Sequence, residues 1–246
     1  QTGGAYPGGN PLDAAAYTAR LGGPASYTGV VGDDEYGALM RRAIAGKGVD
    51  VSHLRTEPGA TALSHVALVN GDRVFGDYEE GVMETFRLTD GDVDFLCSHD
   101  LVVSGLWGRI DGDLPRLKER GVPVAFDFAD KPGEPAAERA LPFVDYAFFS
   151  NDSASDREVE EFLKAISTRG PKIVVVTRGE KGSMAYDGSR FYLGGIVPCK
   201  VVDTMGAGDS FIAGFLYGLM RGRDIPACMA LGAKNSSVTL GYAGAW

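Results

Sequence analysis

The stretch that decides the fold is Asp203-Thr-Met-Gly-Ala-Gly-Asp209, which runs directly into Ser210-Phe-Ile-Ala-Gly-Phe-Leu216. Backbone N–H groups at a helix N-terminus have no partner within the helix and favour an anion. Glycine lets a phosphate approach those groups closely. A carboxylate at this place, Asp209, can accept a proton from an attacking hydroxyl. The string therefore predicts a phosphoryl-transfer site.

The same string has a plainer interpretation as a strand-to-helix turn in which Asp209 is the N-cap. Its surroundings favour the phosphate site. The apolar run Ile196–Val202 before it is typical of a strand, and Phe211, Phe215 and Leu219 after it recur at helical spacing. A glycine loop between a strand end and a helix start is where α/β proteins bind phosphates.

Length and charge restrict the class of protein. A chain of 246 residues can fold as one α/β domain with a small appendage. The net charge of −9, without a dense cluster of Lys or Arg, argues against nucleic acid or a membrane as a partner. The three cysteines lie far apart and no signal peptide or membrane span is visible, so we expect a cytoplasmic protein. Because the sequence starts at Gln1 and not at methionine, we also expect residues before it in the natural chain.

Short apolar runs alternate with amphipathic stretches along most of the chain. Several runs are apolar throughout, as in parallel strands that are covered on both faces. This alternation predicts an α/β fold with a mostly parallel central sheet and helices on both faces. The expected strands are 27–31, 101–104, 122–128, 144–149 and 172–177, and the expected helices are 11–21, 36–47, 114–120 and 157–168.

One region breaks the alternation. Residues 62–69 and 73–78 read as two strands around Asn70-Gly71, the strongest short-range hairpin signal. We therefore expect a single domain, 1–246, with a β-hairpin over residues 62–80 inserted in it. The hairpin is either an edge decoration or a lid over a site, and the residues alone leave both open.

Two further strings could bind ligands. In Gly8-Gly-Asn-Pro-Leu-Asp13, Asn10 is a favoured N-cap and Asp13 falls near the same face of the first turn, behind two glycines that would admit a small polar ligand. A capped helix after a flexible loop is the alternative. Thr177-Arg-Gly-Glu-Lys-Gly182 follows an apolar run and could hold a nucleotide phosphate or ribose, or form an ordinary turn.

Other chemistries find little support. There is no Walker P-loop and no protein-kinase string. His53, His65 and His99 have no metal-ligand spacing. Trp107, which follows an expected strand, either lines a ligand pocket or packs in the core or at its rim.

Taken together, these strings resemble the ribokinase-like carbohydrate kinases, the PfkB family. The resemblance covers nearly the whole chain in order: the early glycine pair, Gly32-Asp-Asp-Glu-Tyr-Gly37, the hairpin, the Thr177–Gly182 loop and the Asp203–Asp209 signature. A closer similarity, to members that phosphorylate a sugar–amino-acid adduct, rests on Arg73-Val-Phe-Gly-Asp-Tyr-Glu-Glu-Gly-Val-Met83, Phe126-Asp-Phe-Ala-Asp-Lys131 and Gly244-Ala-Trp246.

The resemblance implies a role for each matching position. Asp209 would be the catalytic base. The hairpin would be the lid and would also join two chains in a homodimer. ATP would be the donor, with Mg²⁺ travelling with it, and Asp203 would help a monovalent cation such as K⁺ to hold the anion-hole loop. The anion hole would be Gly206, Ala207 and Gly208; the sugar site Gly8, Gly9, Asn10, Asp13 and Asp209; the nucleotide site Thr177, Gly179, Gly182, Asn235 and Asn151.

Three departures limit this transfer. The family usually has Asn where Asp13 stands. The family's Asn-x-x-Glu motif is not intact, because Asn151 begins Asn-Asp-Ser-Ala, which leaves Asp152, Asp156 or Glu158 as replacements for the glutamate. The family's first strand, which supplies an Asp to the sugar, is expected before Gln1.

The sequence therefore predicts an ATP-dependent kinase for a primary hydroxyl of a sugar or of a sugar–amino-acid adduct. Asp209 should stay ionised at neutral pH, since a helix N-terminus lowers the pKa of a carboxylate. The charged ends of an adduct would need partners such as Arg73, Asp77, Glu79 or Arg109. A kinase for an unmodified sugar or a nucleoside, and a non-catalytic sugar or nucleotide sensor, are the alternatives.

Overall fold

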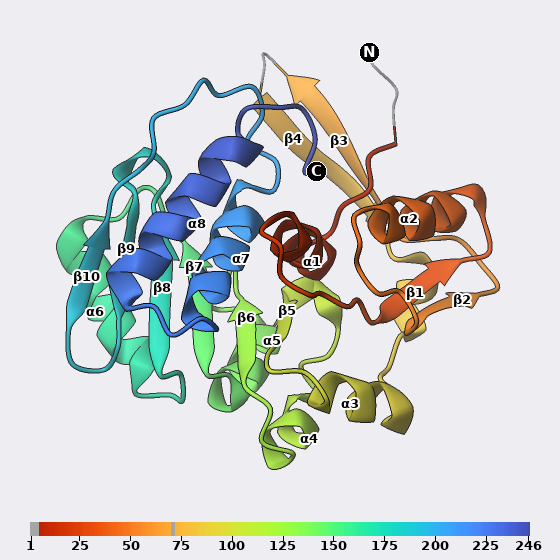
Figure 1. The fold of residues 1–246 in the computed structure, drawn as a ribbon, viewed down its shortest axis with the longest axis horizontal. Helices are drawn as coiled ribbons and strands as arrows, with labels where there is room; N and C mark the ends of the chain where they lie inside the picture. The colour runs from red at the N-terminus through yellow and green to blue at the C-terminus, as the bar shows by residue number, and fades with distance from the viewer. Residues whose placement is uncertain (1–4, 70–71) are drawn as a thin grey trace.

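A six-stranded sheet in the order β10-β9-β8-β7-β6-β5 forms the centre of the molecule (Figure 1). The computed structural model describes residues 5–69 and 72–246. Strands β5 to β8 are parallel, β9 pairs antiparallel with β8, and β10 pairs antiparallel with β9. The strands are β5 (Val102–Gly105), β6 (Val124–Asp127), β7 (Tyr146–Ser150), β8 (Ile173–Thr177), β9 (Ser183–Tyr186) and β10 (Phe191–Gly194).

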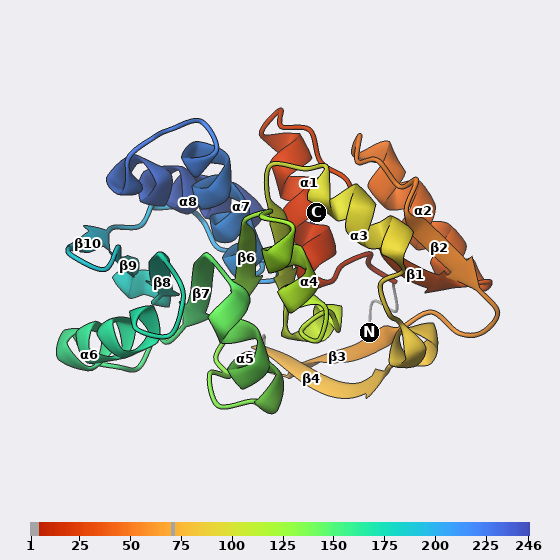
Figure 2. The same ribbon diagram turned by 90° about the horizontal axis from the view of Figure 1, so that it is seen from below.

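Helices cover both faces of this sheet. Figure 2 shows α1, α7 and α8 on one side and α4, α5 and α6 on the other. Apolar side chains from β6, β7 and β8 point alternately into the two layers, so each face has its own core. The helices are α1 (Asn10–Arg20), α2 (Glu35–Gly46), α3 (Asp90–Cys97), α4 (Leu114–Glu119), α5 (Pro135–Ala140), α6 (Asp156–Ser167), α7 (Ala207–Leu219) and α8 (Ile225–Thr239).

The predicted α/β class, with a mostly parallel sheet and helices on both faces, is confirmed, and every expected strand and helix except one strand is present within a few residues. One predicted strand is wrong. Residues 196–202 form no strand. Pro198 has no N–H for a ladder bond, and the Val202 N–H donates to Leu240 at the end of α8 instead. Ile196 and Val201 are more than half exposed, so their apolar character does not reflect burial in a sheet.

Two smaller strand pairs lie beside the main sheet. β1 (Gly29–Gly32) and β2 (Leu54–Glu57) are parallel, and β3 (Leu63–Val69) and β4 (Asp72–Glu79) form the predicted antiparallel hairpin, with Leu63 opposite Glu79. The predicted turn Asn70-Gly71 lies outside the described residues. Asp34 accepts hydrogen bonds from the Thr61 backbone and hydroxyl, which fixes one end of the hairpin.

The topology brings several chain segments to one edge of the main sheet. Parallel strands β5 to β8 all end there, at Gly105, Asp127, Ser150 and Thr177. The N-terminus of α1 reaches the same edge, because Asn10 contacts Asp127. Such an edge is the usual place for a ligand in an open α/β sheet. No helix in the described ranges is long and apolar enough to cross a membrane.

Candidate active site

The glycine-rich loop ends in a tightly fitted helix start. Gly206 is the N-cap of α7 with φ of 72°, a left-handed conformation that glycine adopts without strain. A side chain at this position would also collide with the Tyr17 hydroxyl, which donates a hydrogen bond to the Ala245 carbonyl. Asp209 is the third residue of α7, so the interpretation of Asp209 as the N-cap is wrong. Its carboxylate is available for contacts across the site.

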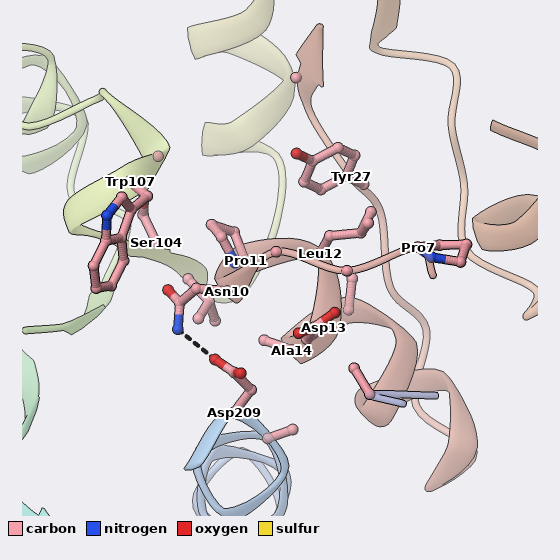
Figure 3. A pocket seen from close by; sticks show the side chains of 18 of the residues that line it. Pro7, Asn10, Pro11, Leu12, Asp13, Ala14, Tyr27, Ser104, Trp107 and Asp209 are labelled. Atoms are coloured by element: carbon pink, nitrogen blue, oxygen red, sulfur yellow. Dashed lines mark hydrogen bonds between the residues drawn. The ribbon is translucent and has the colours of Figure 1, made fainter. Parts of the chain in front are cut away.

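Asn10 joins that carboxylate to a second one. Its side-chain amide donates to Asp127 Oδ2 at 2.6 Å and to Asp209 Oδ1, and Figure 3 shows it pointing toward Asp209 from the start of α1. The predicted N-cap role of Asn10 is wrong: Gly9 is the N-cap of α1 and no side chain caps the helix. Gly105 makes room for Asn10, since a Cβ there would overlap the Asn10 side-chain oxygen.

Three carboxyl groups gather around this amide: Asp13 and Asp209, from helices α1 and α7, and Asp127, from the end of β6. Burial raises the pKa of Asp13 to about 7 and that of Asp127 to about 6. Burial raises the pKa of Asp209 well above its usual value, and the neighbouring charges of Asp13 and Asp127 raise it further. The helix N-terminus was expected to lower the pKa of Asp209, but burial and like charges outweigh that effect and the pKa is raised.

Asp209 lies where two cavities meet. The larger cavity, about 2050 Å³, is lined by residues of α1 and of the β3–β4 hairpin, among others. The smaller, about 220 Å³, lies over the ends of β6, β7 and β8. Asn10, Trp107 and Asp209 line both cavities, and Trp107 is 45% exposed, so Trp107 is not a core residue. Gly208, from the glycine-rich loop, lines the smaller cavity. No Lys or Arg side chain of the described residues lines it.

The predicted sugar-site residues come together in the larger cavity. Gly8, Gly9, Asn10 and Asp13 all line it. Asp13 is buried, and its Oδ1 accepts a hydrogen bond of 2.7 Å from the indole N–H of Trp246. Asp13 and Asp209 both line this cavity, so hydroxyl groups bound in it could contact either carboxylate.

Four of the five predicted nucleotide residues also come together. Thr177 lines the smaller cavity, and Gly179 and Gly182 follow it in the turn between β8 and β9. The Asn151 N–H donates to the Thr177 carbonyl at 2.9 Å. Asn235 lies elsewhere: it is buried between α7 and α8, donates to the Ser210 carbonyl and accepts from Arg20. Its side chain is thus used within the helical layer and does not reach either cavity.

The carboxylates that could replace the missing glutamate differ in availability. Glu158 closes the capping box of α6 with Ser155, and Asp156 pairs with buried Arg178 at 2.6 Å. Asp152 makes no side-chain hydrogen bond or ion pair within the described ranges. In those ranges no three His, Cys, Asp or Glu side chains cluster as a metal site.

Asp203 organises the loop before α7. Its two carboxylate oxygens accept the backbone N–H groups of Met205 at 3.0 Å and Gly244 at 2.8 Å. The loop is therefore held by residues far along the chain as well as by its own turn.

Asp127 is the site residue that the sequence prediction missed. It ends the apolar strand β6 at the ligand edge of the sheet, a position at which a carboxylate is itself a signal of function. The string Phe126–Lys131 contributes to the family resemblance but indicates no role for Asp127 by itself.

A buried carboxylate at a glycine-rich helix start, between a large and a small cavity of an α/β fold, defines a phosphotransferase site. A family model described as pfkB family carbohydrate kinase matches residues 1–246. The chain belongs to this family, which confirms the resemblance drawn from the sequence motifs.

Individual relatives agree with this assignment. A fructoselysine 6-kinase of Shigella flexneri is 43% identical over 242 residues, covering 98% of this chain and 92% of the relative. A fructosamine kinase of Bacillus subtilis is 37% identical over 245 residues, covering 98% and 86%. Among solved structures, Arabidopsis thaliana ribokinase with ribose and ATP has a TM-score of 0.87 at 24% identity, covering 96% of this chain and 82% of that one. An Escherichia coli protein called ribokinase II, with ATP and Mg²⁺, has a TM-score of 0.82 at 22% identity, covering 98% and 85%.

Proposed function

We propose that this protein transfers the γ-phosphoryl group of ATP to a primary hydroxyl of a sugar–amino-acid adduct of the fructoselysine type. The observation that carries the proposal is that Asp209 lines both cavities. A kinase must bring a donor and an acceptor together at one base, and the two cavities offer one space for each.

The roles of the residues follow from this arrangement. The sugar occupies the larger cavity with its hydroxyl at Asp209, which accepts the hydroxyl proton as the oxygen attacks phosphorus. The raised pKa of Asp209 makes the carboxylate a stronger base for that step. The N–H groups of Gly206 and Gly208 would donate to the phosphoryl oxygens as negative charge builds on them, and the Ala207 N–H would join them by exchanging its 3.3 Å contact with the Thr204 carbonyl. Asn10 keeps Asp209 in place from the opposite helix.

An adduct is favoured over a free sugar by the relatives, which are named for fructoselysine and fructosamine. The size of the larger cavity, about 2050 Å³, also leaves space beyond a single sugar ring. A kinase for an unmodified sugar or a nucleoside is the second candidate, since ribokinase shares the fold. A sensor without catalysis has no use for a buried base between two cavities.

ATP is proposed for the smaller cavity and the turn at Thr177, Gly179 and Gly182, beside Asn151. The solved relatives hold ATP, and one holds Mg²⁺ with it. Mg²⁺ would be held mainly by the phosphates, as is usual at ATP sites, and Asp152 is the carboxylate of the altered motif proposed to assist it. The monovalent cation at Asp203, such as K⁺, stays a proposal that a comparison of turnover in K⁺ and in a large organic cation tests.

The β3–β4 hairpin is proposed as a lid over the sugar. Ser64, Val66, Gly76 and Tyr78 of the hairpin line the larger cavity, so its closure would exclude water from the transfer. We also propose that two chains pair through this hairpin, which sedimentation velocity in solution tests.

The proposal is tested by a coupled ADP-release assay with fructoselysine, other glycated amino acids, fructose, ribose and a nucleoside. Asp209→Ala should lower kcat about 10²–10⁴-fold while ATP binding is retained, the usual scale for a positioned base. Asp94→Ala, which removes an exposed aspartate on α3, is the control and should keep wild-type turnover. Near-normal turnover of Asp209→Ala would exclude the base role, and ligand binding without ADP release from any substrate would favour the sensor.

A further inference from the structure

Residues 242–246, here called the strap, lie along one face of α1. Three α1 side chains spaced four and three residues apart contact it: Asp13, Tyr17 and Arg20. Trp246 donates to Asp13, Tyr17 donates to the Ala245 carbonyl, and Arg20 donates to the Tyr242 hydroxyl at 2.8 Å. The strap therefore follows the helix that lines the sugar cavity over nearly its whole length.

The indole of Trp246 is held by apolar packing, by a nearby ammonium group and by its own N–H. Its ring packs against the apolar cluster of Leu12, Ala16 and Ile44, and the Lys47 ammonium lies 5.4 Å from the ring centre. The N–H then points at Asp13 Oδ1. An indole N–H can only donate, so it favours an oxygen acceptor and leaves the second oxygen of Asp13 for another donor.

We propose that Trp246 is a positioning residue for sugar recognition: its indole N–H fixes the Asp13 carboxylate so that the second oxygen accepts sugar hydroxyls in the larger cavity. This inference rests on the proposed function. Asp13 is buried at the cavity wall, where an unfixed carboxylate would have to be oriented at the moment of binding.

The contact also acts on the charge of Asp13. Hydrogen bonds from Trp246 and from the Gly9 backbone lower the pKa of Asp13 against the stronger effect of burial. The titratable groups that face Asp13 are Asp209 on α7 and the phenols of Tyr17 and Tyr27, and none of them is a cation. Loss of the indole N–H should therefore raise the pKa of Asp13 and reduce its ionised fraction near neutral pH.

The test is Trp246→Phe, which keeps an aromatic ring in the apolar cluster and removes the N–H together with the five-membered ring that carries it. The KM for the sugar substrate should rise about 5- to 50-fold, the loss of one charge-assisted hydrogen bond, with kcat changed less than about threefold. The acid limb of kcat/KM for the sugar should move to higher pH. Asp94→Ala, which removes an exposed carboxylate on α3, is the control and should keep the wild-type KM.

Asp13→Asn separates this role from a purely structural one. Asparagine still accepts the indole N–H but does not ionise, so adding Trp246→Phe to Asp13→Asn should produce no further shift of the acid limb. An unchanged KM and pH profile in Trp246→Phe, or an equal shift in both backgrounds, would overturn the inference.

A measurement on the unaltered protein covers the case in which Trp246→Phe does not fold. The two tryptophans give two indole N–H signals in a ¹⁵N NMR spectrum, assigned with Trp107→Phe. The Trp246 signal should titrate with Asp13 and move when the sugar is added, and a signal that responds to neither would overturn the inference. If the wild-type protein releases no ADP with any substrate, the proposed function fails. The pH response of the Trp246 signal would still show whether its indole N–H is bonded to Asp13.

Discussion

Replacing Gly206 by alanine should destabilise the protein strongly, although the change adds only one methyl group. An alanine in the left-handed conformation of Gly206 costs about 1–2 kcal/mol. The new Cβ also occupies the place of the Tyr17 hydroxyl, so the buried hydrogen bond to Ala245 is lost, at a cost of about 1–3 kcal/mol. The free energy of unfolding should therefore fall by about 2–5 kcal/mol, or about 5–15 °C in Tm for a chain of this length.

Gly208→Ala is the matched control, two residues further along. A Cβ at Gly208 meets no atom within 4 Å, and its backbone is not left-handed. Stability should stay unchanged or rise by up to about 1 kcal/mol, because alanine is the better helix former. The methyl group would instead stand in the small cavity, where the phosphoryl oxygens are proposed to bind, and kcat should fall about 10- to 100-fold.

Thermal and urea unfolding of both variants, with turnover by ADP release, separates the two effects. Tyr17→Phe removes the hydroxyl with which the new methyl collides, so the double variant with Gly206→Ala should lose less stability than the sum of the two single losses. If Gly206→Ala is as stable as the wild type, or Gly208→Ala loses as much stability as Gly206→Ala, the reasoning from this helix start is refuted.

Two further predictions concern the carboxyl cluster. Asp127→Asn removes a charge that raises the pKa of Asp209, so the acid limb of kcat/KM should move to lower pH. Asn10→Ala removes a hydrogen bond that lowers the pKa of Asp209, so the acid limb should move to higher pH. Shifts in the same direction for both variants would contradict these opposite effects on Asp209. Asp13→Asn should stabilise the protein relative to the wild type at pH 8 by about 1–4 kcal/mol and by much less at pH 5. The pKa of Asp13 is raised from 3.8 to about 7 in the folded protein. The stability that protonated Asp13 contributes is therefore fully present below pH 3.8, the pKa in the unfolded chain, and is lost as pH rises through 7. Urea unfolding at both pH values measures the difference, and a gap that narrows from pH 5 to pH 8 would disprove it.

The sequence was sufficient where local pattern and burial coincide. Buried β8 is apolar throughout, and α6 begins with a Ser155–Glu158 capping box, so both could be predicted closely. Residues 196–202 are apolar but exposed, and nothing in such a run distinguishes it from a strand. The wrong strand shows that apolar character predicts an element only when the side chains are buried.

The sequence predicted which residues belong to the candidate site better than it predicted the contacts that those residues make. Asn10 has the sequence of an N-cap, but carboxylates 117 and 199 residues away take up its amide. The ionisation of Asp209 depends on Asp13 and Asp127, which only the fold brings close. Capping preferences and the helix dipole describe a helix end in isolation. The hydrogen bonds of Asn10 and the pKa of Asp209 depend instead on residues that lie close only in the folded protein.

The strap has a consequence for the order of folding. Trp246 bonds to Asp13 across 233 positions, and Tyr17 bonds to Ala245 across 228. Contacts between such distant segments form late, because closing a long loop costs entropy before the contact repays it. During synthesis the central sheet can assemble while the strap is still inside the ribosome, and the sugar cavity is then without one of its walls. Recovery of sugar binding should therefore lag behind recovery of secondary structure when the unfolded chain is returned to native conditions.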